Sequence, residues 1–157
     1  MSRNDIMILR LQSEGAETPY VFLGTPADEF GAAFSPDGQW LAYTSDGSGT
    51  PQVYVRPFPG PGPPWPVSLD GGTLPVWSRG GNEILYRALD GRIMAATWAV
   101  HDGRFETRRP SAWTSGRPVD LGQVRAFDAH PDGRRLAAVI EAPESKQHRL
   151  VLLRIRP

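Results

Sequence analysis

The sequence of 157 residues contains no cysteine, which excludes a disulfide framework, a thiolate metal site and a cysteine nucleophile. An excess of charge is missing too, because 17 Lys and Arg side chains balance 17 Asp and Glu side chains. A neutral chain lacks the bulk attraction to phosphate groups that drives binding to nucleic acids and anionic membranes. We therefore expect no nucleic-acid partner.

Long hydrophobic runs are absent as well. The N-terminal stretch MSRNDIMILRLQSEG holds a mostly apolar run of only six residues, which is too short for the core of a signal peptide. No run reaches the roughly 20 apolar residues that a membrane-spanning helix needs. The chain as given is therefore expected to be soluble and without a membrane span, and its compartment is left open.

The motifs of common catalytic and metal sites are also missing. His101, His130 and His148 lie far apart and show no metal-binding spacing such as HExxH. There is no G-x-S-x-G elbow, and Ser35, which could be grouped with His130 and Asp132, begins a predicted β-turn. The sequence therefore predicts no catalytic residue, no metal ligand and no cofactor, and the chain is not expected to be an enzyme.

Glycine and proline are abundant instead, with 17 and 16 residues. Such a composition disfavours long helices and favours short elements joined by turns. Six Asp-Gly dipeptides fit hairpin turns better than calcium loops, because no D-x-D-x-D-G run is present.

An internal repeat organises the chain. Three segments align without gaps: FSPDGQWLAYTSD from Phe34, WSRGGNEILYRAL from Trp77 and AHPDGRRLAAVIE from Ala129. Their starts lie 43 and 52 residues apart, near the period of roughly 40–45 residues of a propeller blade. Each segment reads as an apolar lead-in, a four-residue turn and an apolar-rich strand, and therefore predicts a β-hairpin.

The turns of the three repeats carry the residues that β-turns require. Proline at the second turn position presets φ, aspartate bonds its own backbone, and the closing glycine supplies a left-handed residue. The predicted structural turn residues are Ser35, Pro36, Asp37 and Gly38 in the first repeat, Gly81 in the second, and Pro131, Asp132 and Gly133 in the third.

Further strands are expected after each hairpin. A third strand follows in PQVYVRPF, GRIMAATWAV and HRLVLLRIRP, and a weaker outer strand is expected at 20–25, 65–70 and 109–115. The chain then forms one propeller segment that divides into an incomplete blade at 5–25, blades at 30–70 and 73–115, and an incomplete blade at 124–156.

Apolar residues fall on both faces of the predicted strands. Trp40 and Ala42 face one way and Leu41 and Tyr43 the other, which indicates a sheet covered on both sides. The sequence therefore predicts an all-β fold, a partial β-propeller of about three four-stranded antiparallel blades. A flat sandwich is the alternative, although it would require outward polar faces that these strands mostly lack.

The stretches FSPDGQWLAYTSDGSGTPQVYVRPFPG and DGGTLPVWSRGGNEILYRALDGRIMAATW resemble the TolB-like (WD-like) propeller repeat. They are most similar to the propeller region C-terminal to bacterial serine/threonine kinase domains, and the resemblance covers about residues 5–156. The sequence departs from the family at the second turn, where Arg79-Gly80 replaces Pro-Asp or Arg-Asp, and at His130, which replaces serine.

The resemblance implies a non-enzymatic module for protein or ligand binding, as the sensor or interaction part of a bacterial kinase-like protein. Such a parent would be associated with the membrane, with this part outside the cytoplasm. Two alternatives are a non-catalytic propeller beside a serine-peptidase domain of the prolyl-oligopeptidase type, and a self-assembling structural propeller.

Three blades are too few to close a ring, since closed propellers use at least four. Either the chain is part of a larger propeller, or copies associate so that the N-terminal strand of one completes the last blade of another. An open propeller would expose strand edges and apolar blade faces. We therefore favour self-association into a dimer with six blades.

Loops on a rigid propeller scaffold, at one mouth of the axial channel, are the expected place for a protein or small ligand to bind. Aligning the repeats places equivalent residues at or near the starts of the innermost strands. These candidates are Asp28, Glu29, Phe30, Asp70, Thr73, Gln123 and Arg125.

Overall fold

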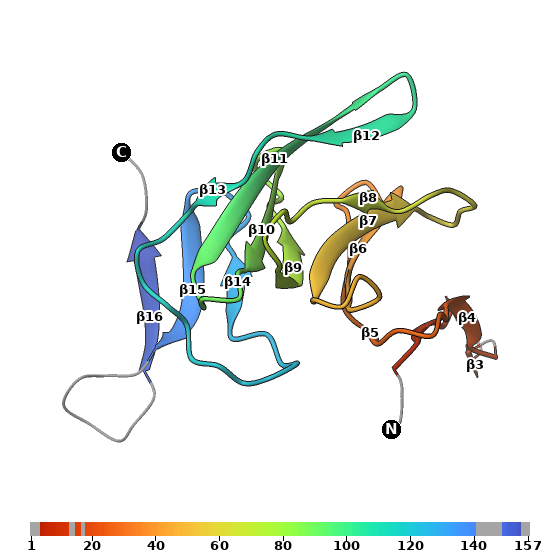
Figure 1. Ribbon diagram of the computed structural model, residues 1–157, viewed down its shortest axis with the longest axis horizontal. Helices are drawn as coiled ribbons and strands as arrows, with labels where there is room; N and C mark the ends of the chain where they lie inside the picture. Colours follow the sequence, from red (N-terminus) through yellow and green to blue (C-terminus); the bar gives the residue numbers. More distant parts are fainter. Residues whose placement is uncertain (1–3, 13–14, 17, 141–148, 155–157) are drawn as a thin grey trace.

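The computed structural model describes residues 4–12, 15–16, 18–140 and 149–154. Every element in this described part is a β-strand, and the strands form antiparallel sheets that follow one another in chain order (Figure 1). Of the sequence predictions, those on His148 and on residues 155–156 lie outside the described residues.

The first complete sheet has four strands, in the order β5-β6-β7-β8. Its strands are β5 (Glu29–Phe34), β6 (Trp40–Ser45), β7 (Gln52–Pro57) and β8 (Trp65–Pro66). The turn of Ser35–Gly38 joins β5 to β6, and the proline-rich stretch after β7 leads to the short outer strand β8.

The second sheet contains β9 (Thr73–Trp77), β10 (Glu83–Arg87), β11 (Ile93–His101) and β13 (Ser111–Ala112). Strand β11 is longer than the blade requires, and its second half pairs with β12 (Arg104–Thr107). The two-residue loop between them has left-handed φ values at both Asp102 (51°) and Gly103 (74°). Two such residues form a type I′ turn, whose twist matches that of a hairpin.

Smaller sheets lie toward both ends of the chain. The last sheet has three strands, in the order β14 (Phe127–Ala129), β15 (Arg135–Ile140) and β16 (Arg149–Arg154). At the N-terminus, β1 (Ile6–Ile8) pairs with β4 (Tyr20–Leu23), and β2 (Leu11–Gln12) pairs with β3 (Gly15–Ala16). The molecule is therefore the predicted all-β partial propeller.

Hydrophobic cores fill the spaces between successive sheets. Strand β6 is buried along its whole length, as the alternation of its apolar residues predicts. Trp40 and Ala42 belong to the core shared with the second sheet, whereas Leu41 and Tyr43 pack against β1 and β4. Another core joins the second and third sheets, and Trp113 is 4% exposed there.

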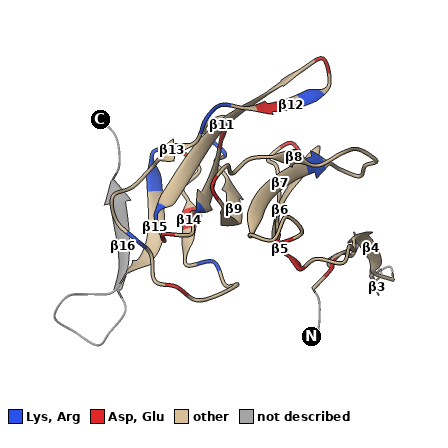
Figure 2. Ribbon diagram, viewed as in Figure 1, with Lys and Arg blue, Asp and Glu red and all other residues tan. Residues whose placement is uncertain are grey.

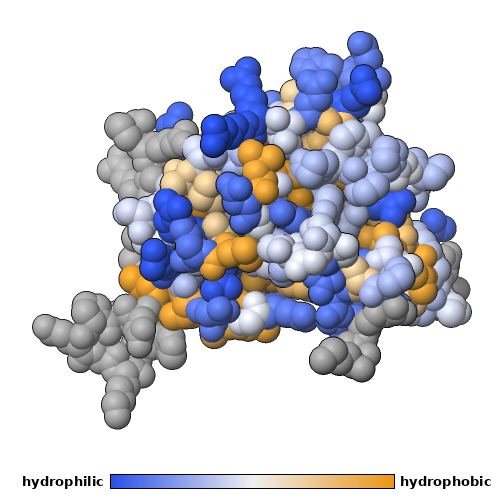
Figure 3. Space-filling view, in the orientation of Figure 1, coloured by the Kyte–Doolittle hydropathy of each residue, from blue (hydrophilic) through white to orange (hydrophobic). Residues whose placement is uncertain are grey.

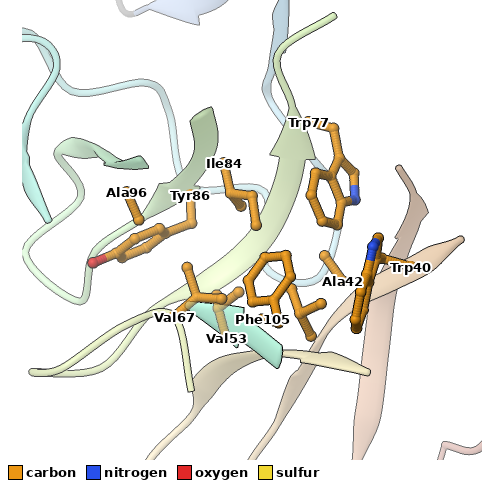
Figure 4. Packing of buried hydrophobic residues seen from close by; sticks show 10 residues of the cluster. Trp40, Ala42, Val53, Val67, Trp77, Ile84, Tyr86, Ala96 and Phe105 are labelled. Atoms are coloured by element: carbon orange, nitrogen blue, oxygen red, sulfur yellow. The ribbon is translucent and has the colours of Figure 1, made fainter. Parts of the chain in front are cut away.

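Aromatic rings dominate the core between the first two complete sheets (Figure 4). Phe105, on β12, is 2% exposed. Its ring stacks on Trp98 at 5.5 Å between centroids and is tilted against Trp40 at 5.1 Å. The β11–β12 hairpin, whose turn is one of the six Asp-Gly dipeptides expected at hairpin turns, therefore returns a large side chain to the core.

The turn at the second repeat differs from the sequence expectation. Gly38 and Gly133 have left-handed φ values of 70° and 68°, and each donates its N–H to the carbonyl at the start of its turn. Gly81, by contrast, has no positive φ. The second turn instead packs against the third, so closely that a Cβ on Gly80 would lie 2.5 Å from the carbonyl oxygen of Pro131. The packing of the two turns therefore leaves no room for a side chain at position 80.

Charged residues of both signs lie along the sheets and their connections (Figure 2). In the face that Figure 3 shows, hydrophobic residues form several small groups among hydrophilic ones. Among the described residues, no helix is long and apolar enough to cross a membrane.

Candidate functional site

The three positions at which the repeats align meet at one place in the fold. Phe34, Trp77 and Ala129 are the last residues of β5, β9 and β14. These strands contact each other, β5 with β9 and β9 with β14, so they form the inner side of the arc of sheets. All three residues line a cavity of about 740 Å³, which we call the channel pocket.

Side-chain to backbone hydrogen bonds join the blades around the channel pocket. The indole Nε1–H of Trp77 donates to the carbonyl oxygen of Ala33 at 2.9 Å, which ties β9 to β5. The guanidinium Nη1 of Arg125 donates to the carbonyl oxygen of Pro75 at 3.3 Å, which ties the segment before β14 to β9. The walls of the pocket are therefore fixed by contacts between strands that lie far apart in sequence.

Charge in the channel pocket comes from Arg79, Arg125 and Asp128. All three are exposed, and neither arginine forms an ion pair within the described part of the chain. Asp128 accepts a hydrogen bond from the backbone N–H of Ala129 at 3.0 Å. Two unpaired cations therefore face the pocket against one carboxylate.

The aspartates beside the channel pocket form their hydrogen bonds and ion pairs with residues that are close to them in sequence. The Asp132 carboxylate lies 2.8 Å from Arg135 Nε and accepts the backbone N–H of Arg134 at 2.9 Å. These bonds, that of Arg134 first, lower the pKa of Asp132 to about 2. Asp37 accepts hydrogen bonds from the Ser35 hydroxyl at 2.5 Å and from a backbone N–H, and the bond to Ser35 is the main cause of its lowered pKa.

Apolar surface borders the channel pocket on the side of the first complete sheet. Phe34 is 48% exposed, and its ring packs edge-on against Phe58 with centroids 4.8 Å apart. Phe58 in turn contacts Phe22 at 5.3 Å. The three rings form an aromatic row that begins at Phe34, which lines the pocket.

The residues predicted from the starts of the inner strands come together only in part. Asp28 and Gln123 are joined through Asn4, whose backbone N–H donates to Asp28 Oδ1 at 2.8 Å and whose Nδ2 donates to Gln123 Oε1 at 3.3 Å. Phe30 packs against the core between the second and third sheets, and Thr73 pairs with Arg87.

Glu29 is 2% exposed, although it was predicted at a solvated mouth. Its carboxylate accepts hydrogen bonds from the hydroxyl and the backbone N–H of Thr25 and from the Ser45 hydroxyl. It also lines a cavity of about 340 Å³ next to Tyr43 and Arg56. Burial, reinforced by Glu29, raises the pKa of Tyr43 to about 12, and Arg56 opposes this shift. The Glu29 carboxylate is therefore buried and hydrogen-bonded to neighbouring residues of the protein.

Asp70 lies in a separate cavity of about 370 Å³ with Tyr86 and Leu89. Burial, followed by the nearby charge of Asp70, raises the pKa of Tyr86 to about 12. Of the seven predicted residues, Arg125 is the one that lines the channel pocket. Among the described residues, no group of three or more His, Asp or Glu side chains could hold a metal ion.

The channel pocket was not predicted, because Ser35, Pro36 and Pro131 carry the pattern of turn residues in the sequence. The signal that could have found it is the repeat itself. Equivalent positions in successive blades lie at the same end of the inner strands, so the three turns must approach each other around the channel axis.

No protein-family model and no curated protein matches this sequence. Among solved structures, TolB from Acinetobacter baumannii is similar over 95% of this chain and 46% of its own, with a TM-score of 0.52 and 15% identity. A Bacteroides uniformis chain named provisionally as a 6-phosphogluconolactonase is similar over 96% of this chain and 51% of its own, with a TM-score of 0.47 and 20% identity. The chain therefore spans about half the length of the β-propeller structures it matches, and the similarity to TolB is one of fold.

Proposed function

We propose that this chain is a non-enzymatic propeller module that binds a protein or ligand in the channel pocket. The observation that carries the proposal is the convergence of Phe34, Trp77 and Ala129 on one cavity of about 740 Å³. A volume between a few hundred and about 1,000 Å³ is typical of ligand sites.

The chemistry around the channel pocket favours binding over catalysis. The Ser35 hydroxyl donates its proton to Asp37 and accepts the backbone N–H of Trp40 at 3.0 Å. His130 lies between Asp132 and Arg135 instead. A serine whose proton is held by a carboxylate in its own turn is not activated by a histidine base.

A labelling experiment tests this proposal. The chain has no cysteine, so Pro36→Cys introduces one thiol at the edge of the channel pocket, where a bulky maleimide blocks access. Peptides are selected on the unmodified chain from a displayed library of random seven-residue sequences. We expect labelled Pro36→Cys to lose the selected peptides, and labelled Arg104→Cys, on the remote β12, to retain them. Failure to select any peptide that Pro36→Cys labelling displaces would refute the pocket as the binding site.

We further propose that the module belongs to a bacterial kinase-like protein as its sensor or interaction part. This rests on the sequence resemblance alone. The alternative parent is a serine peptidase. The full reading frame tests both, because a kinase would carry HRD and DFG motifs upstream and a peptidase would carry G-x-S-x-G downstream.

Self-association into a six-bladed dimer is a second proposal, and a specific observation favours it. Five large hydrophobic residues near the N-terminus are at least 45% exposed, namely Met7, Leu9, Leu11, Tyr20 and Val21. Clustered exposed apolar residues mark interaction surfaces. Within the described residues, the last sheet has three strands where the first complete sheet has four, so it offers an edge that a strand of a second copy could extend.

A further inference from the structure

We infer that the channel pocket binds an acidic peptide segment, with its carboxylate held by Arg79 and Arg125 and a neighbouring apolar side chain packed on Phe34. This inference rests on the proposed function and adds the chemistry of the ligand. It follows from the charge, the geometry and the surroundings of the described pocket residues.

The charge of the pocket selects an anion. Arg79 and Arg125 line it without an ion pair among the described residues, and Asp128 is its one acid. The nearby Asp132 is already paired with Arg135. A guanidinium group binds a carboxylate through two parallel hydrogen bonds, which makes a planar carboxylate a well-matched partner.

The position of Arg125 is fixed before any ligand arrives. One of its terminal nitrogens donates to the carbonyl of Pro75, and the guanidinium carries five N–H donors in all. The remaining donors are available to a ligand, and the anchored side chain loses little conformational freedom on binding. Arg79 reaches the same pocket from the turn between β9 and β10, so the two cations come from different blades.

The apolar surroundings favour a peptide over a small anion. The pocket is much larger than one carboxylate, and Phe34 at its edge is half exposed. The aromatic row continues from Phe34 to Phe58 and Phe22, where Arg56 lies 5.3 Å above the Phe22 ring. An extended segment could place an acid between the arginines and an aromatic or aliphatic residue on this row.

Peptides selected from the random library test the inference. We expect Asp or Glu next to an aromatic or aliphatic residue to be enriched among them. In fluorescence anisotropy titrations, Arg79→Gln and Arg125→Gln should each weaken binding of a selected peptide at least tenfold, and replacing its acids by amides should do the same. Arg104→Gln, which removes an exposed arginine from β12, should leave affinity unchanged. Arg125→Lys should retain part of the affinity, because it keeps the positive charge and loses the paired N–H donors of the planar guanidinium group.

Folding of each variant is checked by circular dichroism and thermal unfolding. Peptides that occupy the pocket but keep their affinity in both glutamine variants would overturn this inference and leave the proposed function standing. Tighter binding of inorganic phosphate or of an oligothymidine than of the selected peptides would also overturn it. Absence of any peptide that Pro36→Cys labelling blocks would instead refute the proposed function itself.

Discussion

At the scale of single residues, glycines show how the blades constrain the sequence. Gly80 and Gly81 are neighbours in one turn, and neither has a positive φ. A Cβ on Gly80 would lie 2.5 Å from the carbonyl oxygen of Pro131, whereas a Cβ on Gly81 would meet only the Ser78 hydroxyl at 3.6 Å. The two positions therefore differ in the room that they leave for a side chain, and not in backbone strain.

We expect Gly80→Ala to lower the free energy of unfolding by about 1–3 kcal/mol, because the added methyl group forces two turns apart. Gly81→Ala is the matched control. It should change stability by no more than about 0.5–1 kcal/mol, and in the stabilising direction, because alanine restricts the unfolded chain. Urea unfolding of both variants measures the difference. Equal destabilisation by the two substitutions would contradict the close contact.

Asp132 makes stability depend on pH. Its pKa is about 2 in the folded protein, below the ordinary value of 3.8, so its contribution is complete above about pH 4 and is lost as the pH falls towards 2. Asp132→Asn should therefore lower the melting temperature at pH 6 and should make a smaller difference at pH 2. A difference that stays constant across this range would show that the carboxylate charge contributes nothing.

At the scale of elements, the β11–β12 hairpin contributes a core side chain in addition to strand pairing. Phe105 projects from it into the aromatic core between two sheets. We expect Phe105→Ala to destabilise the protein by about 3–5 kcal/mol, since a large buried ring leaves a cavity. Glu106→Ala, on an exposed position of the same strand, should have little effect. Thermal unfolding with near-ultraviolet circular dichroism of the tryptophans would report both.

Much of the element structure could be predicted from the sequence because repeats and alternation act locally. Trp40 and Leu41 face different cores as their alternation predicts, and the turns at Gly38 and Gly133 have the expected left-handed glycines. Phe105 could not be placed, because its position depends on how a hairpin folds back over a neighbouring sheet. The channel pocket was missed for the same reason, since it depends on how blades pack against each other.

At the scale of the whole molecule, the exposed apolar residues of β1 and β4 determine how we expect copies to associate. Sedimentation should give a dimer of about twice the 17.3 kDa chain mass at micromolar concentration. Val21→Lys should shift it towards monomer, because Val21 is 55% exposed on the proposed contact surface. Leu89→Lys, equally exposed on the β10–β11 turn, is the control. A stable monomer of the unmodified chain would refute the dimer.

Asn4 connects segments that lie on either side of the second sheet. It hydrogen-bonds Asp28, just before the first complete sheet, and Gln123, just before the third, and it does so at the end of the inner strands opposite the channel pocket. A single residue thus links the two outer sheets, through its backbone N–H to Asp28 and through its side-chain amide to Gln123. Replacing the side chain of Asn4 would therefore remove only the bond to Gln123, because the bond to Asp28 comes from the backbone.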